Sequence, residues 1–214
     1  MSPEKSKKYA IMIIAVFCLI IVTGIGNFRA QQLAVNLTGD RVTHAIDLAA
    51  AELNLEKLQE LIQSHDEKGM YYEELRSDLI RIKTDHELEN IYILYKDESS
   101  KEKFYIADAR QDDDPMHIMP GQLLERSSSA IENTLKGKVV HDVYYTTSLG
   151  EMVSSYQGIK DSNGKTIAVI AGDVQAGSFT QFLFLTRYVQ MGIIAVSLIL
   201  IGCVSLIGKK RLKN

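Results

Sequence analysis

Two long apolar runs near the ends of the chain dominate its hydrophobic pattern. Residues 9–26 read YAIMIIAVFCLIIVTGIG and residues 188–207 read YVQMGIIAVSLILIGCVSLI, and neither run contains a charged side chain. Each run is long enough to cross a hydrocarbon core as a helix. A cleaved signal peptide is the alternative for the first run, but the run exceeds a usual signal core and no small-x-small cleavage site follows Gly26. We therefore expect transmembrane helices at 9–26 and 188–207.

The charges that flank these runs predict the orientation of the chain. Basic residues precede the first run and follow the second: Lys5, Lys7, Lys8, Lys209, Lys210, Arg211 and Lys213. Cytoplasmic flanks of membrane helices carry an excess of such residues. The pattern predicts cytoplasmic tails at 1–8 and 208–214, and an extracytoplasmic domain at 27–187. The basic tail could also hold the protein near anionic lipid.

The first part of the outer domain has a helical period. Apolar residues recur at helical spacing from Val35 to Leu53, so the first membrane helix is expected to continue outward. The seam that these residues form also motivates the hypothesis of a homodimer. Stripes of Leu and Ile predict two further helices, at 55–63 and 70–87.

From Asn90 onward the pattern becomes extended. Runs rich in aromatic and β-branched residues predict strands at 91–97, 103–109, 139–146, 151–158 and 166–174, and a helix is expected at 122–135. The pair Asn163-Gly164 between the last two strands predicts a tight hairpin turn with two positive φ angles. The order favours an α+β domain, an antiparallel five-stranded sheet with a long N-terminal helix and flanking helices.

Charge and cysteine content exclude several functions. The segment 27–187 holds 17 Lys and Arg residues and 26 Asp and Glu residues, a balance unlike that of a nucleic-acid-binding surface. Cys18 and Cys203 both fall inside the apolar runs, so the outer domain has neither a disulfide nor thiolate metal ligands.

Other chemical signatures are weak. The run Asp112–Asp114 followed by His117 lacks the spacing of a calcium loop, and a solvated acidic loop is expected there. The five histidines are scattered, so no metal is assigned. The chain shows no hydrolase, P-loop or dinucleotide motif. We therefore expect neither an enzyme nor a cofactor.

The sequence from about Asn27 to Ser178 resembles a Cache domain, the PAS-like extracytoplasmic sensor of bacterial receptors. The resemblance rests on the order of short motifs: Pro120-Gly121, Gly137, Leu149-Gly150, Ser154-Ser155-Tyr156, Asp161 to Lys165, and Asp173. Leu149 stands where an aromatic residue is common, and Gln157-Gly158-Ile159 replaces the usual small residue, Pro and Ile. These departures concern the type of ligand more than the fold.

The resemblance implies a PAS-like fold in a bacterial cell membrane, with a small-molecule site between the sheet and the loops that cross it. Amino acids or carboxylates are frequent ligands of such domains. Carried over to this chain, the candidate ligand-binding residues are Tyr92, Tyr105, Asp108, Tyr144, Ser154, Tyr156 and Asp173. For each tyrosine taken singly, a half-buried residue of the sheet is the alternative.

Asp173 is the sharpest of these candidates. It follows the apolar run Ile167–Ala171, where a carboxylate is costly to bury unless it is paired or hydrogen-bonded. A ligand ammonium could pair with it. A partner within the domain, or exposure at the end of the strand, is the alternative.

Two functions follow from these expectations. In the first, the chain is a membrane-anchored small-molecule sensor that lacks an output domain of its own and signals through a separate membrane protein. In the second, it is an accessory interaction protein whose Cache fold no longer binds a ligand. The first function predicts a partly polar site beneath Asp173, and the second predicts an exposed apolar patch.

Overall fold

The computed structural model describes residues 3–147, 150–176 and 188–199. The chain divides into two compact units, one formed by Met1–Ala34 with Ser178–Asn214 and the other by Val35–Gly177. The expected tail at 208–214, the stretch 200–207 of the expected second membrane helix and residues 177–187 lie outside the described residues.

The first apolar run is helical throughout its described length. Helix α1 spans Pro3–Glu52, and its segment Ile13–Glu52 is long and apolar enough to cross a membrane. The second apolar run is described as a shorter helix, Tyr188–Ile199. The expected continuation of the first helix beyond residue 26 is confirmed, whereas a two-pass topology stays a prediction.

Two short helices follow α1. Helix α2 spans Leu55–Ser64, and the side chain of Asn54 caps it by accepting a hydrogen bond from the backbone N–H of Lys57 at 3.1 Å. Helix α3 spans Met70–Asp85 and buries the stripe of Leu75, Leu79 and Ile82. Both helices lie close to the ranges predicted from the apolar periodicity.

The sheet has five antiparallel strands in the order β2-β1-β5-β4-β3. Its strands are β1 Asn90–Lys96, β2 Lys103–Asp108, β3 Val140–Thr147, β4 Gly150–Lys160 and β5 Thr166–Gln175. The last strand of the sequence therefore lies at the centre of the sheet. The predicted α+β fold, an antiparallel five-stranded sheet with a long N-terminal helix and flanking helices, is confirmed.

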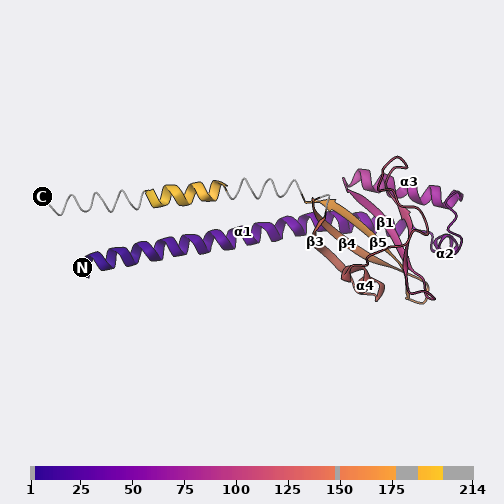
Figure 1. The fold of residues 1–214 in the computed structure, drawn as a ribbon, viewed down its shortest axis with the longest axis horizontal. Helices are drawn as coiled ribbons and strands as arrows, with labels where there is room; N and C mark the ends of the chain where they lie inside the picture. The colour runs from indigo at the N-terminus through magenta and orange to yellow at the C-terminus, as the bar shows by residue number, and fades with distance from the viewer. Residues whose placement is uncertain (1–2, 148–149, 177–187, 200–214) are drawn as a thin grey trace. The chain divides into compact units, whose positions relative to one another are not determined.

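Two faces of the sheet carry different layers. Figure 1 shows α3 and α4 on opposite sides of the sheet. Helices α1, α2 and α3 cover one face of the sheet, where they pack against Ile91, Ile93 and Ile170. Helix α4 covers the other face, where it packs against Leu94, Tyr156 and Val169. The alternation of side chains along each strand assigns every sheet residue to one of these layers.

Helix α1 packs closely on the central strand. A Cβ atom at Gly172 of β5 would lie 2.8 Å from Val42 and 3.0 Å from Ile46, so only glycine fits under the helix there. Val42, Ile46 and Ala49 are buried in this core. The seam that motivated the homodimer hypothesis is therefore used within one chain, and a homodimer stays a prediction with no surface assigned to it.

The expected helix at 122–135 is wrong in its first half. Helix α4 spans only Ser129–Leu135, and the Ser128 side chain caps it. The segment before it follows the edge strand β2: the N–H of Tyr105 donates to Gln122 at 2.9 Å, and the N–H of Leu124 donates to Lys103 at 2.8 Å. An edge strand offers unpaired backbone groups, and pairing with them keeps this segment extended.

The turn between β4 and β5 also differs from the prediction. Gly164 has a φ of +79°, but Asn163 is not among the described residues with positive φ, so this is not a two-residue turn. The carboxylate of Asp161 accepts the N–H groups of Asn163 and Lys165, each at 2.9 Å. A longer turn organised by this aspartate therefore joins the strands.

Candidate functional site

Polar side chains gather on the sheet face that α4 covers. In the strand register Asn90 lies opposite Asp173, which lies opposite Ser154. Tyr92 lies opposite Ala171, which lies opposite Tyr156. Residues paired in this way project from the same face. The register therefore collects residues from β1, β4 and β5 in one buried polar cluster.

Asp173 lies at the centre of the cluster and is only 9% exposed. Its carboxylate accepts hydrogen bonds from the hydroxyls of Ser154 and Tyr145, the latter at 3.3 Å. Burial raises the pKa of Asp173 to about 6, although these two hydrogen bonds and the nearby Arg110 oppose the rise. The carboxylate thus has partners within the domain, yet its environment still disfavours the charged form.

Three further tyrosines lie near this carboxylate. The rings of Tyr92 and Tyr105 lie 5.8 Å apart. Burial, and next to it the charge of Asp173, raises the pKa values of Tyr92 and Tyr156, and burial with the charge of Asp108 raises that of Tyr105 to about 12. These hydroxyls therefore stay protonated near neutral pH and remain available as hydrogen-bond donors.

The buried carboxylate of Asp108 marks the other end of the cluster. Its Oδ2 accepts the N–H of Ile118 at 3.1 Å and lies 3.8 Å from both Arg110 and His117. Its Oδ1, the Oδ1 of Asn90 and the Nδ1 of His117 are buried without a hydrogen-bond partner among the described residues. Buried polar atoms are normally paired. The two unpaired oxygens are acceptors that a polar donor, from a water molecule or a ligand, could satisfy.

Arg110 supplies a positive charge near Asp108 and Asp173. Its guanidinium donates to the carbonyl of Met116 at 3.1 Å and lies 3.8 Å from Asp108 and from Asp114. It also lowers the pKa of Asp173 through its charge. The cluster therefore combines carboxylate acceptors with one guanidinium donor, the groups that would bind an ammonium and a carboxylate of the same small molecule.

The acidic loop next to this site is exposed over residues 111–113, as the sequence suggested, and it also makes contacts with the domain. Asp112 pairs with Arg76 at 2.5 Å, and Arg76 donates to the carbonyl of Arg110 at 2.6 Å. Asp114 accepts the N–H of Met116 at 2.8 Å. These contacts fix the position of the loop that contains Arg110. Across the described part of the chain, no group of three or more His, Cys, Asp or Glu side chains is arranged to hold a metal ion.

Six of the seven predicted site residues fall in this cluster: Tyr92, Tyr105, Asp108, Ser154, Tyr156 and Asp173. Tyr144 lies apart from them, 39% exposed on the edge strand β3. Its neighbour Tyr145 contacts Asp173 instead. A shift of one residue along a strand moves a side chain to the opposite face, and a bulge lies between Val140 and Val143.

Three members of the site were not predicted from the sequence, namely Tyr145, Asn90 and Arg110. In the structure Val143 lies opposite Ser154, and Tyr145, two residues further along β3, projects from the same face. The sequence pattern indicated Asn90 only as the point where the extended region begins. Arg110 lies in a loop, where periodicity gives no direction for a side chain.

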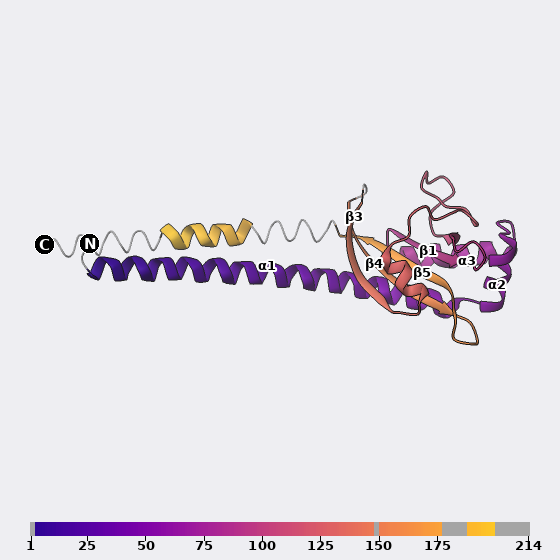
Figure 2. The ribbon, with the colours of Figure 1, turned by 60° about the horizontal axis from the view of Figure 1, so that its bottom comes forward.

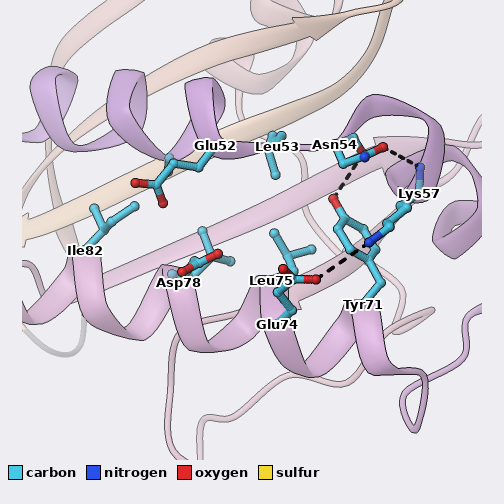
Figure 3. Close-up of a pocket in the computed structure, with 11 residues that line it drawn as sticks. Glu52, Leu53, Asn54, Lys57, Tyr71, Glu74, Leu75, Asp78 and Ile82 are labelled. Carbon is cyan, nitrogen blue, oxygen red and sulfur yellow. Dashed lines mark hydrogen bonds and ion pairs between the residues drawn. The ribbon is translucent and has the colours of Figure 1, made fainter.

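A separate crevice lies where α1, α2 and α3 meet. It has a volume of about 260 Å³ and carries the carboxylates of Glu52, Glu74 and Asp78. Figure 3 shows Asn54, Lys57, Tyr71 and Glu74 joined by interactions along one side of it. Lys57 pairs with Glu74 at 3.8 Å, and Arg81 pairs with Glu52 and Asp78. The first pair links α2 to α3 and the Arg81–Glu52 pair links α1 to α3, whereas the Arg81–Asp78 pair lies within α3.

Comparison with known proteins gives likenesses of fold only. Neither a scan against protein-family models nor a search of curated proteins finds a match. Among solved structures, the chain is similar to the sensor domain of E. coli DcuS, with 16% identity, a TM-score of 0.47 and coverage of 70% of this chain and 96% of that one.

Two ligand-binding domains of chemoreceptors are also similar. That of Campylobacter jejuni Tlp3, in complex with L-valine, has 15% identity and a TM-score of 0.40, with 86% and 68% of the two chains covered. That of Pseudomonas aeruginosa PctC, in complex with GABA, has 13% identity and a TM-score of 0.37, with 73% and 66% covered. Because the sequence identities and the TM-scores are low, a ligand can be inferred only from the residues of this chain.

Proposed function

We propose that this protein is a membrane-anchored sensor domain of the Cache type that binds a small molecule with an ammonium group. An amino acid satisfies the cluster best, because its ammonium would lie by Asp108 and Asp173 and its carboxylate by Arg110. The observation that carries the proposal is that the Oδ1 of Asp108 and the Oδ1 of Asn90 are each buried without a hydrogen-bond partner among the described residues. An ammonium carries three hydrogen-bond donors and no acceptor, so it is suited to acceptors of this kind.

The position of the site supports a role in signalling. Asp173 lies on β5, directly after Gly172, and α1 packs on Gly172 through Val42 and Ile46. A ligand that moves β5 would therefore press on the helix that also contains the first apolar run. Such a response requires a ligand affinity that differs between two arrangements of the domain.

We further propose that the protein signals through a separate membrane protein and catalyses no reaction itself. The polar cluster contains a buried carboxylate, tyrosines and a guanidinium, which together suit recognition of a charged small molecule.

Thermal unfolding of the full chain in a nonionic detergent tests the ligand proposal. The chain is melted with and without a panel of amino acids, small carboxylates, amines and purines. A ligand at a hundredfold excess over its Kd stabilises the folded state by about 2.7 kcal/mol, which a melt resolves. We expect an amino acid to raise the melting temperature.

Variants locate the effect. Asp108→Asn and Asp173→Asn keep the shape of the side chains but remove the charge, and each should abolish the ligand-induced rise. Tyr144→Phe, at an exposed position on the opposite face of the sheet, should leave it intact. If no compound in the panel shifts the melt, or if both Asn variants respond like the parent chain, the sensor proposal fails and the accessory interaction protein takes its place.

A further inference from the structure

A groove crosses the end of the sheet that carries the β4–β5 turn. Its volume is about 600 Å³, its walls come from α2 and α4, and its floor comes from the ends of β1 and β5. Figure 2 shows α2 at the same end of the sheet as this turn. Small-molecule sites typically measure roughly 300–1,000 Å³. The groove is lined by none of the residues assigned above to the buried polar cluster, so any ligand in it would be a second one.

The lining of the groove is basic. It contains four lysines and two glutamates: Lys96, Lys101, Lys136, Lys165, Glu98 and Glu132. Both glutamates are already engaged, Glu98 with Lys165 and Glu132 with Lys103 outside the groove. Lys96, Lys101 and Lys136 have no ion-pair partner within the part of the chain that the structure describes. The four lysines and two glutamates of the lining give the groove a net charge of +2, and the charges of Lys101 and Lys96 also act on Glu98 and Glu132.

This positive charge contrasts with the rest of the domain, in which acidic residues outnumber basic ones. A concave surface concentrates the field of the charges that line it. Anions are thus drawn to the groove although the domain as a whole repels them.

The floor between these lysines is apolar. Ile62, Leu135 and Ile167 contribute aliphatic side chains, and Tyr95 contributes its ring. The Tyr95 hydroxyl is held by His65 at 2.6 Å, and its ring lies against Phe104 at a centroid distance of 5.6 Å. Tyr95 is therefore a fixed part of the floor. An apolar body fits over it while charged groups reach the lysines at the rim.

We propose that this groove binds a small organic anion with at least two negative charges on an apolar body. The proposal does not depend on the function assigned to the buried cluster. A polycarboxylate on an aromatic ring meets the requirement, because its ring covers the apolar floor and its carboxylates approach Lys96, Lys101 and Lys136 together.

Isothermal titration of the full chain with trimesate, an aromatic tricarboxylate, tests the proposal. The chain is kept in nonionic detergent and low salt, in a buffer without polyvalent anions. We expect saturable binding with a Kd below about 1 mM. Benzoate, with the same ring and one charge, should bind at least tenfold more weakly. Raising the salt from about 0.01 M to about 1 M shortens the Debye length from about 30 Å to about 3 Å and should abolish binding.

Matched variants assign the site. Lys96→Gln combined with Lys136→Gln removes two exposed lysines, and the affinity should fall by about fivefold for each, the Coulomb effect of two unit charges about 4 Å apart in water. Lys68→Gln combined with Lys138→Gln removes the same charge from exposed positions outside the groove and should leave the Kd unchanged. Absence of saturable binding, equal affinity for benzoate, or equal weakening by both double variants would overturn the proposal.

The thermal panel distinguishes the two proposed sites. Asp173→Asn should leave trimesate binding intact, and the Lys96→Gln and Lys136→Gln variant should keep its response to an amino acid. Failure of one experiment therefore leaves the other proposal standing.

Discussion

At the scale of single residues, Asp173 makes the stability of the domain depend on pH. Its pKa is raised from 3.8 to about 6, mainly by burial, so the folded state holds this proton more tightly than the unfolded chain. The stabilising contribution is full below about pH 4 and is lost as the pH rises through about 6. By linkage, ionisation of Asp173 lowers the free energy of unfolding by about 3 kcal/mol.

Asp173→Asn removes this titration and should change the pH profile. We expect the melting temperature of the variant, minus that of the parent, to rise between pH 4 and pH 7. Thermal unfolding of both chains in parallel measures the difference, with Asp113→Asn, an exposed position in the acidic loop, as the control. A difference that stays constant over this range would show that Asp173 does not titrate as its environment indicates.

The candidate site was predictable as far as strand periodicity determines which residues are buried. Asp173 could be singled out because a carboxylate directly after an apolar run is costly without a partner. The phase of the edge strand β3 was not predictable, because the bulge between Val140 and Val143 shifts it. Tyr145 was missed for this reason, and Arg110 was missed because its position depends on a loop held by Arg76.

At the scale of elements, the packing of α1 on β5 depends on a missing side chain. Gly172→Ala would place a methyl group 2.8 Å from Val42 and 3.0 Å from Ile46. Overpacking of this kind typically costs about 1–3 kcal/mol. We expect a lower melting temperature for Gly172→Ala, and partial recovery when Val42→Ala is added.

Double-mutant analysis tests whether the cost comes from this contact. If the two changes act through one contact, their effects on the unfolding free energy will not add. Additive losses, with the double variant the least stable of the set, would mean that the strand and the helix adjust independently.

The elements themselves were largely predictable, since hydrophobic period identifies strands and amphipathic helices from local sequence alone. The exception is the segment before α4, where the backbone of Gln122 and Leu124 pairs with the edge of β2. Such pairing depends on a strand distant in the fold. Local helical spacing gave no sign of it.

At the scale of the whole molecule, the sequence predicts that residues between the two apolar runs lie on one side of the membrane and both tails on the other. The described helix Ile13–Glu52 fits a first span by length and composition, while the second span is described only over Tyr188–Ile199. The orientation rests on the basic residues outside the two runs.

Labelling of single cysteines in intact bacterial cells tests this topology. With Cys18 and Cys203 changed to Ser, a new cysteine at Asp113, which is exposed in the acidic loop, should react with a membrane-impermeant thiol reagent. Cysteines introduced at Ser2 and Asn214 should react only after the cells are opened. Labelling at Asn214 in intact cells would place the tail outside and leave one span. The segment after β5 would then not cross the membrane. A ligand at Asp173 would have to act through α1 alone.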